Sequence, residues 1–155
     1  MSFEEAALEV TGSEKIKEDL RLTWGILSNE LEDTGVTLML TLFKMEPGSK
    51  ARFGRFGNID SGMGRDKLRG HSITLMYALQ NFMDSLDNTE KLRCVVDKFA
   101  VNHRIRKISA SEFGWIMKPI REVLMERMGQ FYDPSFVDAW GKLIGVVQAS
   151  LAREQ

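Results

Sequence analysis

The sequence predicts an all-α fold. Apolar residues recur at helical spacing along most of the chain, strand-like alternation is weak, and capping residues stand at several breaks between the apolar stripes. The chain has 155 residues, of which 43% are hydrophobic, so one domain with a sizeable core is expected. We therefore predict a single domain over residues 1–155, in which 1–12 form an N-terminal extension without a defined helical pattern.

The first half of the chain contains three predicted helices. Ser13 can cap the first, and the second runs from about Thr34 to the Pro47-Gly48 pair. The apolar face of the second helix is predicted to consist of Val36, Met39, Leu40 and Phe43. The glycine-rich stretch 49–64 is predicted to be a corner that contains a helical turn, and a long helix follows over about 66–86.

The second half contains three more predicted helices. Asp87 or Asn88 begins the first of them, which carries His103. The next is predicted to start at a capping box of Ser109 and Glu112 and to be kinked by Pro119, or to leave a carbonyl free there. The last is predicted to begin at Asp133-Pro134, because aspartate is a good cap and proline suits the first turn.

Composition excludes several functional classes. The formal net charge is −1, so no strong field attracts nucleic acid or an anionic membrane. No apolar stretch reaches the ~18 residues that a membrane span requires, and no signal peptide is recognisable. Cys94 is the sole cysteine, which favours a reducing compartment and, for that residue, the role of a small buried side chain. A cytoplasmic protein without nucleic-acid or membrane partners is expected.

The two histidines, His71 and His103, each lie on the apolar stripe of a predicted helix. A buried imidazole must find partners for its nitrogens, and hydrogen-bonded core histidines are one way to meet that need. A shared metal cofactor is another. Zinc is disfavoured because it takes three or four protein ligands, whereas a planar cofactor that already supplies four ligands needs one or two histidines. At this level both interpretations stay open.

Two segments carry a specific resemblance. Residues 67–82, KLRGHSITLMYALQNF, resemble the distal helix of a globin, and residues 94–103, CVVDKFAVNH, resemble the proximal helix. Residues 107–113, KISASEF, are similar to the corner that follows. Together they resemble the intracellular haemoglobins of ark clams, and the resemblance extends from about Lys15 to Leu151.

The resemblance implies a globin fold with haem b (iron protoporphyrin IX) and reversible binding of molecular oxygen, as well as carbon monoxide and nitric oxide. His103 then matches the proximal iron ligand, with its other N–H directed at a carbonyl near Phe99, and His71 matches the distal donor to oxygen. Phe56 stands where relatives have leucine. The further implied cofactor contacts are Phe53, Leu75, Phe99, Met39, Phe43, Lys98, Asn102 and Arg55.

The resemblance also implies assembly. Distal and proximal helices of two subunits would meet in a homodimer or a tetramer located inside blood cells. Phe99 would shift between pocket and interface as oxygen binds, which would make binding cooperative. Glu32 is expected to pair with Lys91 of the partner subunit. The other polar residues expected at the interface are Thr74, Asn81, Asn88, Asn102 and Arg55.

Three other functions remain as alternatives: a haem enzyme that acts on nitric oxide or peroxide, a haem-free helical interaction module, and a sensor. No catalytic residue is assigned, and an enzyme is not expected. The residues Trp24, Trp115 and Trp140 are expected to pack in the core or between helices rather than at a ligand site.

Overall fold

The computed structural model describes residues 1–153 apart from the side chain of Arg55, and this part of the chain is helical and without strands. Three 3-10 segments lie between the α-helices: η1 (Pro47–Phe56), η2 (Gly114–Ile116) and η3 (Gly129–Phe131). The α-helices are α1 (Phe3–Thr11), α2 (Glu14–Leu27), α3 (Leu31–Met45), α4 (Gly62–Met83), α5 (Thr89–Ile105), α6 (Ala110–Phe113), α7 (Met117–Met128) and α8 (Pro134–Ala152). The predicted all-α class is confirmed.

Several helices begin at a side-chain cap. Backbone N–H groups in the first turn of a helix have no partner within it, so a polar side chain just before the helix can accept from them. The capping side chains predicted from the sequence, those of Ser13, Asn88, Ser109 and Asp133, all accept such a hydrogen bond. At Ser109 the reciprocal bond from the Glu112 side chain is present too, which confirms the capping box.

Two predictions inside the helices are wrong. Helix α3 begins at Leu31 rather than near Thr34, and Leu40 is 46% exposed, while Leu38 is fully buried in its place. Pro119 lies in the first turn of α7, and its missing N–H would have bonded to the carbonyl of Trp115, four positions earlier. Trp115 lies in η2, the 3-10 segment that interrupts this helical stretch.

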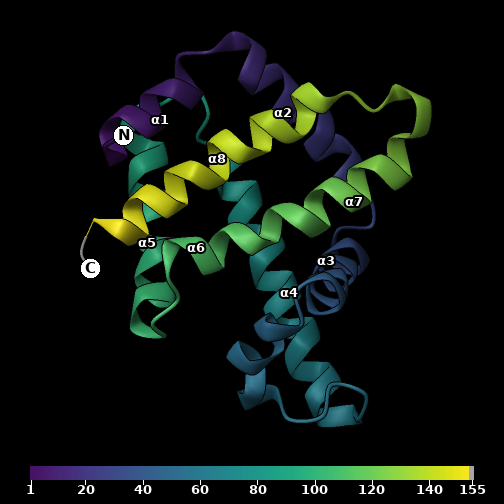
Figure 1. The fold of residues 1–155 in the computed structure, drawn as a ribbon. Coiled ribbons are helices and arrows are strands. Elements are labelled where there is room, and N and C mark those ends of the chain that lie inside the picture. The colour runs from purple at the N-terminus through teal and green to yellow at the C-terminus, as the bar shows by residue number, and fades with distance from the viewer. Residues whose placement is uncertain (154–155) are drawn as a thin grey trace.

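The N-terminal residues form part of the fold. Ser2 caps α1 by accepting from the Glu5 N–H at 3.1 Å. Phe3, Ala7 and Val10 are buried where α1 packs against α5 and α8. Figure 1 shows the start of α1 and the end of α8 at the left of the molecule, and the corner that contains η1 at the bottom.

Helix α8 is the centre of the core. It contacts α1, α2, α5, α6 and α7, and Trp140, Leu143 and Val147 on it are fully buried. Its diagonal course across the molecule beside α7 is visible in Figure 1. No helix within residues 1–153 is both long and apolar enough to cross a membrane.

Helices α3 and α4 approach each other almost to backbone contact. A Cβ atom placed on Gly35 of α3 would lie 2.8 Å from the Ser72 carbonyl oxygen of α4. Only glycine permits such a close approach without displacement of a helix. Because Ser72 directly follows His71, this contact sets the position of His71 relative to α3.

Candidate functional site

His103 lies near the end of α5 with one ring nitrogen already engaged. Its Nδ1 is 3.0 Å from the carbonyl oxygen of Phe99, one turn earlier. A carbonyl can only accept, so Nδ1 carries the proton and Nε2 of the neutral ring keeps its lone pair. This is the hydrogen bond expected from the sequence, and it leaves Nε2 as the atom that can bind a metal.

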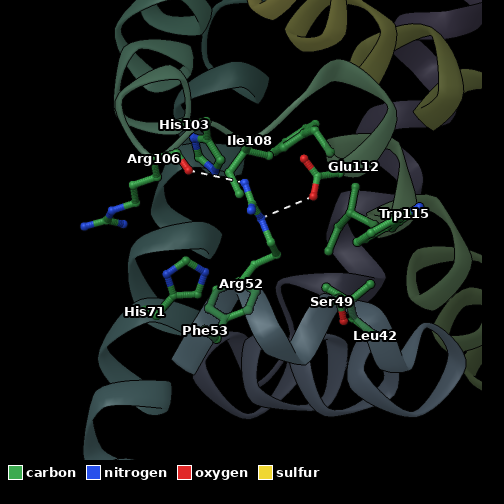
Figure 2. Close-up of a pocket in the computed structure, with 12 residues that line it drawn as sticks. Leu42, Ser49, Arg52, Phe53, His71, His103, Arg106, Ile108, Glu112 and Trp115 are labelled. Carbon is green, nitrogen blue, oxygen red and sulfur yellow. Dashed lines mark hydrogen bonds and ion pairs between the residues drawn. The ribbon is translucent and has the colours of Figure 1, made fainter. Parts of the chain in front are cut away.

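His71 lies on α4 and is oriented by aromatic residues of the corner. Its ring centroid is 5.0 Å from that of Phe53 and 5.7 Å from that of Phe56, both in η1. Phe56 is buried, and its side chain places a second ring against the histidine. Figure 2 shows His103 above His71, and both side chains line one pocket from different helices, α5 and α4.

One pocket brings the two histidines together with apolar side chains. The free cavity among its side chains is about 80 Å³. Its walls come from α3, η1, α4, the end of α5 and the segment that leads into α7. The lining residues are Leu42, Ser49, Arg52, Phe53, His71, His103, Arg106, Ile108, Glu112, Phe113, Trp115 and Ile116.

The other predicted cofactor contacts lie behind this lining or outside it. Phe43 packs edge-to-face on Phe53 with centroids 5.3 Å apart, and Phe99 packs at a tilt on His103 with centroids 4.3 Å apart. Met39 and Leu75 are buried in the core but do not line the cavity. Two polar residues of α5, Lys98 and Asn102, are exposed, and the side chain of Arg55 lies outside the described residues.

The residues predicted at an interface are exposed, namely Thr74, Asn81, Asn88, Glu32 and Lys91. Glu32 pairs within the chain, with its Oε1 2.7 Å from Nη2 of Arg69. Lys91 donates to the Asp84 carbonyl at 3.4 Å. Cys94 is exposed on α5, so its predicted burial on the inner face of that helix is wrong.

Several lining residues were missed by sequence reasoning. Trp115, expected in the core or between helices, lines the pocket together with Phe113 and Ile116. Arg52 also lines it and reaches across to Glu112, sixty positions later in the chain. No periodic or motif signal in the sequence connects residues so far apart. The capping box at Ser109 was the one local signal for Glu112.

The turn after α5 has an unusual backbone. Lys107 adopts a left-handed conformation with φ of 61°. Its N–H donates to the Arg104 carbonyl, and the Ile108 N–H donates to the His103 carbonyl, both at 2.9 Å. This pair of bonds is a Schellman motif, in which the left-handed residue is usually glycine. The carbonyl of His103 itself therefore takes part in the closure of the helix.

The donor set fits a metal held by a planar ligand rather than a bare ion. Among residues 1–153, no group of three or more histidine, cysteine or acidic side chains could hold a metal ion. His103 offers one nitrogen, which suits a metal whose other positions are already filled. The surrounding walls are mostly apolar, as for a largely apolar cofactor. The residues present thus fit haem.

Comparison with known proteins decides the family. A family model described as Globin matches residues 36–151. The chain belongs to the globin family. "Globin, minor" of Anadara trapezia is 55% identical over 97% of this globin and 99% of the relative. "Globin-2 B chain" of Anadara inaequivalvis is 54% identical, with 95% and 97% covered. The more distant "Cytoglobin-1" of Oryzias latipes is 29% identical over 83% of this globin and 75% of the relative.

Proposed function

We propose that this globin binds haem b through His103 and carries molecular oxygen reversibly. The observation that supports this most directly is that one pocket with mostly apolar walls contains both His71 and His103, whose Nδ1 is bonded to the Phe99 carbonyl. Membership of the globin family supports the choice of cofactor. When bound, the haem iron supplies the reversible coordination of oxygen, carbon monoxide or nitric oxide.

His103 on one wall of the pocket would hold the metal, and His71 on the other wall would bind the ligand. The Nδ1–H of His103 donates to the Phe99 carbonyl, which fixes the ring and makes Nε2 a better ligand. On the other wall, an N–H of His71 donates to a ligand that carries partial negative charge. The free energy of such a hydrogen bond is about 1–1.5 kcal/mol, roughly tenfold in affinity. Phe53 and Phe113 exclude water from the pocket.

The test is spectroscopic. Purified protein reconstituted with haem is expected to show a strong haem band that shifts when carbon monoxide is added to the reduced form. His103→Gly should abolish stable ligation, and added imidazole should restore it, which separates loss of the ligand from loss of the fold. His71→Val should retain haem but release oxygen about tenfold faster. A native protein that takes up no haem would refute the proposal.

We also propose that exposed residues of α4 and α5 form a subunit interface that makes oxygen binding cooperative. Relatives carry the printed names "Globin-1 subunit beta" and "Globin-2 A chain", which support assembly from several chains. Tyr77 on α4 and Val101 on α5 are exposed apolar side chains, 57% and 39% respectively. The polar residues Thr74, Asn81, Asn88 and Asn102 are exposed on or beside the same two helices.

Sedimentation velocity tests the assembly. Tyr77→Glu should shift the haem-loaded protein toward monomers, whereas Phe131→Glu in η3, an aromatic that is even more exposed at 74%, should leave the mass unchanged. Phe99 is half-buried against His103 and Phe82 and can report on both pocket and interface. Phe99→Val should lower the Hill coefficient of oxygen binding; an unchanged coefficient would refute its role in cooperativity.

A further inference from the structure

Arg52 extends from η1 across one edge of the pocket. Its Nη2 donates to the carbonyl oxygens of Lys107 at 2.6 Å and Arg106 at 3.3 Å, just beyond the end of α5. Its Nε lies 3.2 Å from Oε2 of Glu112. Figure 2 shows the Arg52 side chain rising from beside Phe53 and ending between His103 and Glu112. We name this set of contacts the Arg52 clasp.

The clasp holds the one backbone segment of this region that is strained. Lys107 is left-handed, a conformation that residues with a Cβ atom adopt at a cost. The carbonyl oxygen that receives the shortest hydrogen bond of the clasp belongs to this same residue. Carbonyls at a helix C-terminus carry partial negative charge, so a guanidinium is a suitable partner for them.

The capping box orients the Glu112 side chain toward Arg52. Its Oε1 accepts from the Ser109 N–H at 3.0 Å in the capping box, and Oε2 is thereby presented to the guanidinium. Both side chains are partly shielded, with 33% of Arg52 and 25% of Glu112 exposed. Screening by salt is therefore weaker than for a pair on the open surface.

We propose that Arg52 is a positioning residue that holds the last turn of the His103 helix against the corner and so slows haem loss. The clasp connects the two walls of the pocket, because η1 also carries Phe53, which packs on His71. It acts on His103 through the Schellman motif, in which the His103 carbonyl accepts the Ile108 N–H. The claim that the clasp slows haem loss rests on the proposed function. The claim that it holds the last turn of α5 does not.

Amide hydrogen exchange of the haem-free protein tests the helix end. Arg52→Met keeps the aliphatic stem and removes the donors, so the Ile108 N–H should exchange about tenfold faster. Arg52→Lys keeps the charge and should recover part of the protection. In a Lys107→Gly background, where glycine adopts the left-handed conformation without the clasp, the effect of Arg52→Met should fall below about twofold.

The matched control is Arg21→Met, which removes an arginine that pairs with Asp87 far from the pocket. It should leave Ile108 exchange unchanged. Equal exchange rates for Arg52→Met and Arg21→Met would overturn the proposal. So would an undiminished effect in the glycine background, because the clasp would then not act on the strained residue.

Two measurements on the haem-loaded protein test the consequence for His103. Arg52→Met should transfer haem to an excess of a haem-free acceptor about tenfold faster and shift the iron–histidine stretching band of the reduced form. A loosened fold without loss of positioning would leave that band in place. Unchanged transfer together with faster Ile108 exchange would overturn the link to haem. A native protein that takes up no haem would refute the proposed function, while Ile108 exchange still decides the role of the clasp.

Discussion

The ring of Phe56 lies against the imidazole of His71, with 5.7 Å between their centroids and 55° between their planes. Phe56 also contacts Phe53, at 5.4 Å. His71 is therefore oriented by a pair of phenylalanines from η1 and not only by its own helix.

Phe56→Leu should loosen this aromatic cluster. Each aromatic pair contributes about 0.5–1.5 kcal/mol beyond burial, so the free energy of unfolding should fall by about 1–2 kcal/mol. The His71 ring resonances should broaden as the ring gains freedom. Urea denaturation and NMR measure the two effects. Phe131→Leu, in which a 74% exposed ring is replaced, is the control and should change neither.

Gly64→Ala should disrupt the corner. A Cβ atom there would lie within van der Waals overlap of the Asn58 and Phe56 carbonyl oxygens, both of which are backbone atoms. The free energy of unfolding should fall by about 2–4 kcal/mol. Gly70→Ala in the same helix, where nothing lies within 4 Å of the added atom, should instead stabilise by about 0.5–1 kcal/mol. Equal effects of the two substitutions would contradict the geometry of the corner.

Thr23→Val should leave a buried donor without a partner. The Trp140 indole N–H donates to the Thr23 hydroxyl at 2.7 Å, and both side chains are fully buried. Valine keeps the shape but cannot accept, so unfolding should become easier by about 1–3 kcal/mol. Thr23→Ser keeps the hydroxyl and should cost less. The order of the two denaturation midpoints measures this, and a reversed order would show that the methyl group matters more than the hydrogen bond.

Asp97 should make the free energy of unfolding depend on pH in the acidic range. Burial alone would raise the pKa of its carboxyl, but the hydrogen bond from Ser150 and the charges of Arg153 and Arg104 lower it. A lowered pKa in the folded state stabilises the protein above the unfolded value of about 4, and this stabilisation is lost as the pH falls through the folded pKa.

The comparison with Asp97→Asn isolates this effect. The difference in unfolding free energy between the native protein and the variant should be constant near neutral pH and shrink below about pH 4. Because Asp97 is 37% exposed, the difference should also decrease with added salt. Ser150→Ala should weaken the pH dependence. A difference that stays constant down to pH 3 would contradict the assignment.

Local chemistry explains which parts of the fold could be predicted from the sequence. The caps at Ser13, Asn88 and Asp133 were found because donor and acceptor lie within three residues. Leu40 was misplaced because a helix with many apolar residues does not reveal which face is buried. That choice depends on which neighbouring helix covers the face.

The residues of the candidate site also divide into those that local sequence could predict and those that it could not. His71 and His103 could be located from their apolar stripes and from the family resemblance. Arg52 could not, because its partners at Arg106, Lys107 and Glu112 are close to it only in the folded chain. Arginine is common in loops, and nothing in the sequence around Arg52 distinguishes it from other arginines.

The hydrogen bond from His103 to the Phe99 carbonyl is confined to one helical turn, whereas the setting of His71 depends on phenylalanines from a separate segment. The setting of His71 can therefore change through substitutions in η1, whereas the hydrogen bond of His103 depends on its own helix alone. Under the proposed function, substitutions at the corner can change the setting of His71 around a bound ligand without a change at His103, the proposed metal ligand. Divergence in oxygen affinity among related chains should therefore accumulate in η1 sooner than in the last turns of α5.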